Sequence, residues 1–411
     1  MLDPQTIRHD DLRHGQGPWL PGIARPPGRT LAADTRCDVV VVGAGITGAL
    51  MAEHLTAMGK DVVLIDRERE GFGSTAASTA MLQWEIDLQI SELAALYGFE
   101  AAAEIYRMSF KAVEQLGELV GQLAIPCGFS PRPTVYLAAG EVGPRELLAE
   151  HEARRRAGLP GDFVEHADLL GRFGFDRAAA IVSPGSAEAD PLSLCHGLIA
   201  MATKRGARLL REEAVSYDGS GATAAVTLKS GRVVEAGAIV LATGYVMPDC
   251  VQDDLHRVAS SWAVATVPQA PEALWPGRAL VWEASEDYCY CRTTTDGRIV
   301  FGGEDEEIEQ PEAREELDEA KTEALRRRLH ALLPKARLDF SHSWSGAFGQ
   351  TEDGLPLIGR VPGHPRLLAA YGYGGNGITF SFLASRMLGA LIEGREESWF
   401  RHFAIDRPNP A

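Results

Sequence analysis

Two short hydrophobic runs separated by a helical segment form the clearest pattern in the N-terminal part of the chain. Residues 39–42 are four consecutive valines, and residues 62–65 read Val-Val-Leu-Ile. Continuous apolar runs of this length are typical of strands that are buried on both faces of a parallel sheet. Because a glycine turn and an apolar helical face lie between the runs, the pattern predicts a strand–helix–strand unit that ends at Asp66.

The rest of the chain alternates between helical and strand-like segments. Helices are predicted over 88–125, 191–206 and 312–333, where apolar residues recur with helical spacing. Strand-like runs follow one another from residue 258 and indicate a mainly antiparallel sheet. The predicted strands cover 207–210, 223–229, 232–236, 238–244, 258–267, 279–283, 287–293, 298–302 and 366–370.

The turn after the first strand carries a dinucleotide-binding pattern. Gly43 permits a tight turn, Gly45 lets a pyrophosphate approach the backbone, and Gly48 lets the helix pack closely on the strands. The start of the helix then offers N–H groups and a partial positive charge to the phosphates. Asp66 is placed to accept hydrogen bonds from an adenosine ribose, and its charge disfavours NADP. The pattern alone does not separate FAD from NAD.

Composition and charge narrow the class of protein. The chain has 411 residues, of which 45% are hydrophobic, and a net charge of −17, which argues against nucleic acid and anionic membrane surfaces. It has no apolar run long enough for a membrane span and no Sec signal at its start, so we expect a cytoplasmic protein. Residues 1–36 read as an extended leader, and the scattered cysteines show no zinc-ligand spacing, so no metal site is predicted.

Five motifs in order resemble the D-amino acid oxidase superfamily, which includes glycine oxidase, sarcosine oxidase and the D-amino acid dehydrogenases. After the glycine fingerprint come the small and hydroxylated residues of 71–85, then Ala-Thr-Gly at 242–244, Asp-Gly-Leu-Pro-Leu-Ile-Gly at 353–359 and Gly-Gly-Asn-Gly-Ile at 374–378. The resemblance implies FAD as cofactor and oxidation of a carbon–nitrogen bond. It also implies an α/β fold in which a Rossmann-like FAD domain is interleaved with an α+β, mainly antiparallel-sheet substrate domain.

The resemblance also suggests domain boundaries. The FAD domain would comprise 37–87, 160–256 and 345–405, and the substrate domain 88–159 and 257–344. A helix opening at Gly375 would direct N–H groups toward the anionic edge of a reduced flavin, although these glycines could also serve only to fit a crowded helix start. The residues predicted to contact the cofactor are Gly43, Ala44, Gly45, Ile46, Thr47, Gly48, Asp66, Arg67, Gly73, Ser74, Thr75, Ala76, Ser78, Thr79, Ala80, Met81, Leu82, Val215, Thr243, Gly244, Gly346, Gly374, Gly375, Asn376, Gly377, Ile378 and Thr379.

The chain lacks the side chains that tether FAD in some relatives. The position of a tethering cysteine is Gly346, and residues 73–80 contain no histidine. His54 lies on the first predicted helix and is expected to be an exposed or capping residue. We therefore expect non-covalent FAD.

Basic residues that relatives use near the substrate are also missing. Phe348 and Met81 stand where the resemblance implies arginines, and Thr379 stands where it implies a lysine. A buried carboxylate without a cation is costly, so either Arg292 supplies the charge or the substrate is an amine without a carboxylate. Arg292 could equally pair with an acidic neighbour at 304 or 305. Val300 replaces the lysine that promotes oxygen reactivity in sarcosine-type oxidases, which leaves room for a dehydrogenase.

The predicted substrate pocket is aromatic. Tyr290 and Phe348 are the first choices, with Arg292 and Tyr373, and Gln83, Trp84 and Tyr288 are further candidates. The expected reaction is hydride transfer from a neutral amine to flavin N5, giving an imine, in a pocket that excludes water. The electron acceptor, O₂ or another molecule, and the oligomeric state stay open. The alternatives are an NAD-dependent dehydrogenase and a flavoprotein electron-transfer subunit without substrate turnover.

Overall fold

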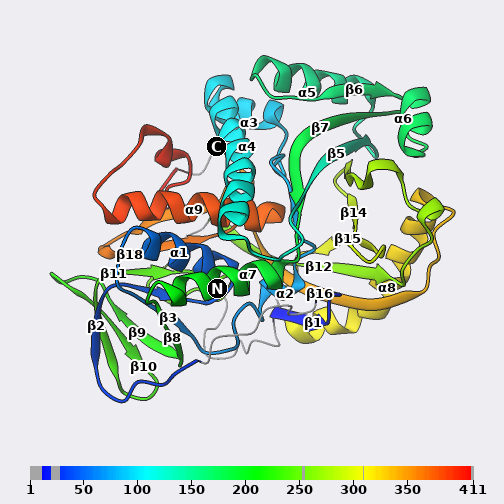
Figure 1. Ribbon diagram of the computed structural model, residues 1–411. Helices are drawn as coiled ribbons and strands as arrows, with labels where there is room; N and C mark the ends of the chain where they lie inside the picture. Colours follow the sequence, from blue (N-terminus) through cyan, green and yellow to red (C-terminus); the bar gives the residue numbers. More distant parts are fainter. Residues whose placement is uncertain (1–11, 20–27, 252–254, 309, 409–411) are drawn as a thin grey trace.

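The computed structural model describes residues 12–19, 28–251, 255–308 and 310–408, which fold into two sheets flanked by helices (Figure 1). The combination of a largely parallel sheet and a largely antiparallel sheet confirms the predicted α/β fold class. The sheets meet along the carboxyl ends of the parallel strands, which is where ligands bind in open α/β folds.

The first sheet is built around the predicted strand–helix–strand unit. Its strands lie in the order β17-β18-β11-β2-β3-β8; the pairs from β18 to β8 are parallel, and β10 and β9 extend the sheet from β11. Val39 and Val41 pack in one hydrophobic cluster and Val40 and Val42 in another, so this strand is buried on both faces as predicted. The strands are β2 (Thr35–Val42), β3 (Val62–Asp66), β8 (Arg208–Arg211), β9 (Ala214–Asp218), β10 (Ala224–Leu228), β11 (Val233–Leu241), β17 (Leu357–Val361) and β18 (His364–Tyr371).

The second sheet is mainly antiparallel, as predicted. Its order is β1-β16-β12-β15-β14-β13-β5-β7-β4, with β6 beside β7, and β13 pairs with β5 in parallel. The strands are β1 (Arg13–Gly15), β4 (Met81–Leu82), β5 (Ser130–Ala138), β6 (Asp162–Glu165), β7 (Ala179–Glu188), β12 (His256–Thr266), β13 (Leu280–Ala284), β14 (Cys289–Thr293), β15 (Ile299–Glu306) and β16 (Phe340–Thr351).

Helices cover the sheets and connect them (Figure 1). Helix α1 packs against α7 and α9, α4 contacts both α9 and β7, and α8 packs on β12, β15 and β16. The helices are α1 (Ile46–Ala57), α2 (Ser74–Ala77), α3 (Ile90–Tyr97), α4 (Phe99–Leu123), α5 (Pro144–Arg156), α6 (His166–Phe173), α7 (Pro191–Lys204), α8 (Pro311–Leu332) and α9 (Gly377–Ile392), with 3₁₀ turns at Pro271–Ala273, Pro276–Arg278, Gly374–Asn376 and Ser398–His402. Among the described residues, no helix is long and apolar enough to cross a membrane.

Two predicted elements have different bounds in the structure. The helical pattern over 88–125 is divided into α3 and α4 at Gly98. The predicted strands 232–236 and 238–244 form one strand, β11, because it pairs with β2 in a single register from Val234 to Leu241. Gly237, which separated the two predicted strands, is an exposed residue within β11.

The predicted domain boundaries stay a prediction; the division of the chain between the two sheets falls at other residues. The segment assigned to the FAD domain from residue 160 begins with β6, which pairs with β7, and with β7, which pairs with β5 in the antiparallel sheet. Strand β16, which spans the predicted boundary at 345, also belongs to that sheet. After β7, which pairs with β5, the chain leaves the antiparallel sheet and continues through α7 to β8 of the parallel sheet.

Part of the predicted leader is packed against the rest of the molecule. Residues Arg13–Gly15 add a strand beside β16, and Trp19 is buried, with its indole Nε1 donating to the Ser78 carbonyl oxygen at 2.8 Å. These residues hold the small-residue segment in place from outside. The remainder of the predicted leader includes 1–11 and 20–27, which lie outside the described residues.

Candidate functional site

A cavity of about 1680 Å³ lies between the two sheets and is lined by residues of both. This volume exceeds the 300–1,000 Å³ that is usual for small-molecule sites, as an extended ligand requires. The cavity runs from the ends of β3 and β9 to residues of β5, β13 and β16. We call these its nucleotide end and its substrate end.

The glycine turn leaves space for a ligand at one position and is tightly packed at the other two. A Cβ added at Gly43 would collide with the Ala242 carbonyl, and one added at Gly48 would collide with the Gly43 carbonyl. An added Cβ at Gly45 meets only the Thr75 hydroxyl, at 3.2 Å, and otherwise faces open space. The open backbone at this position fits the pyrophosphate of a dinucleotide cofactor.

Asp66 is tied to the turn that precedes α1. Its Oδ2 accepts the Ala44 N–H at 2.6 Å and its Oδ1 accepts the Glu68 N–H at 2.7 Å. Burial raises the pKa of this carboxyl to about 6, although both backbone N–H groups lower it. Asp66 also lines the cavity. Its contact with a ribose stays a prediction.

The structure brings most of the predicted cofactor residues together around the cavity. Five do not line it. Ala44 and Gly48 lie inside the glycine turn, and Ala76 and Leu82 are turned toward other parts of the protein. Thr379 is held away from the cavity, because its Oγ1 donates to the Gln83 carbonyl at 2.8 Å. All the other predicted cofactor residues line the cavity, although they come from five separate parts of the chain, at 43–81, 215, 243–244, 346 and 374–378. Sequence alone missed further lining residues, among them Glu85, Asp87, Tyr136, Trp282 and Tyr245.

The turn before α9 is bonded to the segment that follows β4. Asn376 donates from its side chain to the carbonyl oxygens of Gln83 at 3.1 Å and Glu85 at 2.7 Å. The Gly375 N–H, which the sequence predicts to face a flavin, donates to Asp87 Oδ2 at 2.9 Å. The glycine-rich turn therefore fixes residues 83–87 at the cavity wall.

The predicted aromatic pocket is present in part. Tyr290, Phe348 and Tyr288 line the substrate end, as does Gln83. Trp84 does not, because it is fully buried with its Nε1 donating to the Pro184 carbonyl at 2.9 Å.

Two further findings complete the aromatic wall. Tyr373 touches the cavity, but its hydroxyl donates to the Ala370 carbonyl at 2.8 Å and is turned away from a substrate. Tyr136 and Trp282 stack with their ring centroids 3.8 Å apart and extend the wall. Because the two neighbouring strands that carry these rings, β5 and β13, are far apart in the sequence, no local pattern could have indicated that the rings meet.

The prediction for Arg292 requires correction. Its side chain is buried behind the wall, where Nη1 donates to the Ala80 carbonyl at 2.7 Å and the guanidinium lies over the Trp19 ring. It neither lines the cavity nor forms a described ion pair with the acidic residues 304 and 305. Burial lowers its pKa to about 10, so it stays a cation at neutral pH. Arg292 lies on the same face of β14 as Tyr290, but further along the strand, where Trp19 and the Ala80 carbonyl cover it and separate it from the cavity.

Charges are distributed unevenly along the cavity. Among the described residues that line it, the cations are Arg67, Arg69 and Lys229, and all three lie at the nucleotide end. The substrate end is lined instead by the carboxylates of Glu85, Asp87 and Glu283. A ligand carboxylate placed there would meet no cation from the lining residues.

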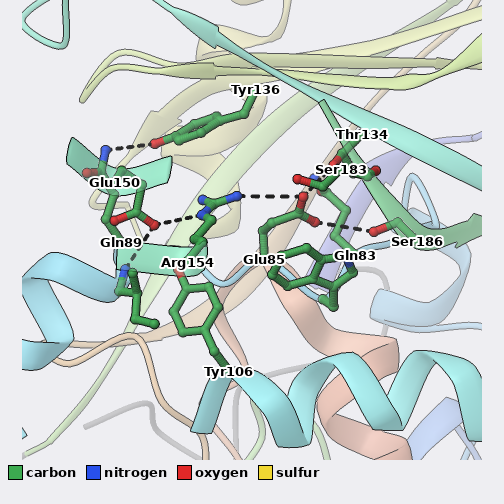
Figure 2. A network of polar contacts seen from close by, with 12 residues as sticks. Gln83, Glu85, Gln89, Tyr106, Thr134, Tyr136, Glu150, Arg154, Ser183 and Ser186 are labelled. Carbon is green, nitrogen blue, oxygen red and sulfur yellow. Dashed lines mark hydrogen bonds and ion pairs between the residues drawn. The ribbon is translucent and has the colours of Figure 1, made fainter. Parts of the chain in front are cut away.

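A buried charged network lies behind Glu85 (Figure 2). Arg154 Nε donates to Glu150 Oε1 at 2.7 Å, and Arg154 Nη1 lies 3.8 Å from Glu85 Oε1. Glu85 also accepts hydrogen bonds from the hydroxyls of Thr134 and Ser186. Burial raises the pKa of Glu85, and the charge of Arg154 opposes this rise. The carboxylate of Glu85 is therefore already satisfied by protein groups.

The same network fixes the start of α3. Glu150 accepts the backbone N–H groups of Ile90 at 3.1 Å and Ser91 at 3.2 Å, and the Arg154 guanidinium lies 5.3 Å from the centre of the Tyr136 ring. The ion pairs thus join α3, α5 and β5 to residues 83–87 behind the substrate end.

Nothing in the lining contradicts non-covalent cofactor binding, which stays a prediction. Gly346 lines the cavity without a thiol, and the described lining residues contain no histidine. His54 is half-buried beside Arg386, and burial together with this cation lowers its pKa to about 3. Of the two expectations, exposed or capping, the structure places His54 in the last turn of α1, where its carbonyl accepts the backbone N–H of Met58.

Comparisons with known proteins agree with this geometry. A family model described as DAO, FAD dependent oxidoreductase, matches residues 38–391. The chain is 26% identical over 384 residues to gamma-glutamylputrescine oxidoreductase of Escherichia coli K12, covering 90% of this chain and 87% of the relative. It is 24% identical over 376 residues to glycine oxidase of Geobacillus kaustophilus, covering 89% and 95%.

Solved structures show the same architecture. Glycine oxidase from Geobacillus kaustophilus has a TM-score of 0.76 at 21% identity, covering 91% of this chain and 99% of that one. L-proline dehydrogenase from P. horikoshii has a TM-score of 0.73 at 19% identity, covering 91% and 98%. At these identities the likeness shows a shared fold.

Proposed function

Because the chain belongs to the DAO family of FAD-dependent oxidoreductases, we propose that it oxidises the C–N bond of an amine that has no carboxylate beside the reacting carbon. The family match confirms the predicted resemblance and favours FAD over NAD, and the relatives support oxidation of an amine or amino acid. By their names, the two relatives act on gamma-glutamylputrescine and on glycine. The choice between an amine and an amino acid must therefore come from this chain's own residues.

The observation that carries the proposal is the charge of the substrate end. Glu85, Asp87 and Glu283 line it, and Phe348 stands where the resemblance implies an arginine for a substrate carboxylate. An anionic group bound there would lose its water without gaining a cation, which is unfavourable by several kcal/mol. An ammonium group meets carboxylates and aromatic faces, both of which stabilise a cation.

The chain's residues define what the protein contributes to the reaction. When bound, FAD supplies the acceptor for a hydride from the carbon that bears the nitrogen. The open backbone at Gly45 and the start of α1 would hold its phosphates, and Tyr290 and Phe348 would bound the space beside the reacting carbon. The stacked Tyr136 and Trp282 extend the apolar wall and reduce access of water.

A panel of substrates tests this proposal directly. Purified protein is mixed without oxygen with primary and secondary alkylamines, with diamines, and with glycine, sarcosine and D-amino acids. We expect amines to bleach the flavin absorbance near about 450 nm and the amino acids to do so far more slowly. Faster bleaching by glycine or sarcosine would overturn the proposal. No bleaching by any compound would support the alternative of an electron-transfer subunit.

Three narrower predictions concern the same enzyme. Val300, which is fully buried, stands where the resemblance implies the lysine that promotes oxygen reactivity, and no lysine among the described residues lines the substrate end. We therefore propose an acceptor other than O₂, and measuring peroxide during aerobic turnover tests this. We propose non-covalent FAD, which acid precipitation would release into the supernatant. A cytoplasmic location is supported by the six cysteines, all of which are described and none of which forms a disulfide.

A further inference from the structure

Asp87 occupies a space that two consecutive glycines leave open at the substrate end. A Cβ added at Gly374 would collide with Asp87 Oδ2, and one added at Gly375 would lie 2.8 Å from Oδ1. The Gly375 N–H donates to Oδ2 at 2.9 Å and fixes the carboxylate against the turn before α9. The glycine pair in this turn therefore makes room for a carboxylate at the cavity wall.

Asp87 differs from the other carboxylates at this end because no cation neutralises it. Glu85 faces Arg154, and Glu283 accepts hydrogen bonds from Arg177 at 2.9 Å and Arg328 at 3.2 Å. None of the ion pairs among the described residues includes Asp87. Its side chain is accessible from the cavity, so a ligand can reach it.

The groups around Asp87 are acidic or phenolic. Asp305 on β15 raises its pKa through charge repulsion, and Tyr288 and Tyr245 lie close enough to interact with its charge. Tyr288 donates to Asp305 Oδ2 at 2.7 Å, which holds that second carboxylate in place. The surrounding protein partly desolvates the carboxylate, although its side chain is open to the cavity. This desolvation and the repulsion raise the pKa of Asp87 to about 6, although the Gly375 N–H lowers it. At neutral pH the residue is a charged carboxylate of increased basicity.

We propose that Asp87 is a catalytic residue that binds the ammonium group of the substrate and accepts one of its protons. The proposal rests on the proposed function and adds the group that prepares the amine. An ammonium nitrogen has no lone pair, so the adjacent carbon cannot release a hydride until a proton leaves. The N–H bond breaks, its proton goes to a carboxylate oxygen of Asp87, and the nitrogen keeps the electron pair.

FAD, as the oxidant of the proposed reaction, accepts the electrons that the substrate then loses. The C–H bond then breaks with its electron pair passing to FAD as hydride, while the nitrogen lone pair forms the C=N bond of an iminium product. Asp87 returns its proton to water when the product leaves. This step replaces the expectation from the sequence that the amine binds neutral: the amine binds as an ammonium, and Asp87 removes the proton.

The first test measures binding without turnover. Tetramethylammonium cannot lose a proton or a hydride, and it is titrated into the oxidised, flavin-loaded enzyme by calorimetry, with tert-butanol as a neutral probe of similar size. We expect the dissociation constant for tetramethylammonium to rise at least about tenfold in Asp87→Asn, and that for tert-butanol to stay unchanged. Asp162→Asn, an exposed position on β6, is the matched control for net charge.

The second test measures the pH dependence of flavin reduction by the best alkylamine of the panel. In the unaltered enzyme, the ratio of the reduction rate constant to the dissociation constant should fall below pH 6, as Asp87 becomes protonated. In Asp87→Asn the ratio should be about 10²-fold lower at pH 7. In this variant the ratio should rise tenfold for each unit of increasing pH, because only the small fraction of amine that is neutral in solution can react.

Several outcomes would overturn the assignment. The assignment is wrong if Asp87→Asn leaves the rate of flavin reduction and its pH profile unchanged. It is also wrong if the variant binds tetramethylammonium as tightly as the unaltered enzyme does. If Asp87→Asn does not retain flavin, the unaltered enzyme still decides, because its affinity for tetramethylammonium must weaken below pH 6 while its affinity for tert-butanol must not. A failure of the proposed function appears separately, as amino acids that reduce the flavin faster than amines.

Discussion

Arg407 holds Asp353 in a two-point ion pair that is almost completely buried. Arg407 Nη2 lies 2.8 Å from Asp353 Oδ1 and Nε lies 2.9 Å from Oδ2, and the two side chains are 3% and 2% exposed. The hydroxyl of Tyr97 donates to the same Oδ2 at 2.6 Å. Asp353 begins the motif at 353–359 that contributed to the family resemblance, and in this protein it fastens the C-terminal segment to the turn between β16 and β17.

Breaking this pair should destabilise the protein strongly. We expect Asp353→Asn or Arg407→Met to lower the free energy of unfolding by about 3–5 kcal/mol, because each leaves one buried charge without its partner. Urea unfolding of the flavin-loaded protein measures the effect. The double variant should cost less than the sum of the two single changes, and additive costs would show that the pair does not act as a unit.

The same pair should make stability depend on acid pH. Burial raises the pKa of Asp353, but the hydrogen bonds and charge of Arg407 outweigh this effect and bring it below its usual value of about 4. The folded pKa lies below the unfolded one, so the stabilisation is fully present above pH 4 and is lost as the pH falls through the folded pKa. Unfolding measured from pH 7 to pH 3 should show a smaller loss in Arg407→Met than in the unaltered protein.

A methyl group at Gly48 should disturb the glycine turn. Gly48→Ala places a Cβ against the Gly43 carbonyl, so we expect a loss of about 1–3 kcal/mol and a lower flavin content after purification. The matched control is Gly121→Ala on α4, where an added Cβ meets nothing within 4 Å. That change should stabilise the helix by about 0.5–1 kcal/mol and leave flavin content unchanged. Full flavin occupancy in Gly48→Ala would contradict this account of the turn.

Removal of Arg154 should destabilise the protein most at high pH. Burial places the folded pKa of Glu85 above its unfolded value, so this group favours the folded state at low pH and opposes it as the pH rises through the folded pKa. Arg154→Met removes the cation that limits this penalty, and we expect a loss of about 3–5 kcal/mol at pH 8 and a smaller loss at pH 5. Arg155→Met, an exposed change on the same helix, should have little effect. Equal losses at both pH values would indicate that Glu85 does not carry the dependence.

The nucleotide end could be predicted from the sequence because its determinants are local. The strand at 39–42, the glycines that follow it and the strand at 62–65 lie within one continuous segment, and parallel strands place their turns at one edge of the sheet. The residues of the later glycine turns reach the same cavity for the same reason, since β11 and β18 lie parallel to β2.

The substrate end could be predicted only in part. Tyr290 and Phe348 line the cavity as predicted, but Arg292, on the same face of β14 as Tyr290, is covered by Trp19 and residue 80, which come from distant parts of the chain. Asp87 was not predicted, because its place at the cavity wall depends on a glycine pair that lies far along the chain. Helical segments were recognised by spacing, whereas the break at Gly98 and the merging of β11 depend on neighbouring elements.

By itself, the amino-acid sequence determined that this protein has a dinucleotide-binding turn, buried parallel strands and an acidic character, because each of these follows from neighbouring residues or from composition. Only the tertiary structure decided the charge of the substrate end. It pairs Glu85 with Arg154 and Glu283 with Arg177 and Arg328 across long distances in the sequence, and leaves Asp87 without a cation at the cavity wall. Which carboxylates are neutralised is settled by the packing of separate segments, and that packing determines which ligand charge the cavity stabilises.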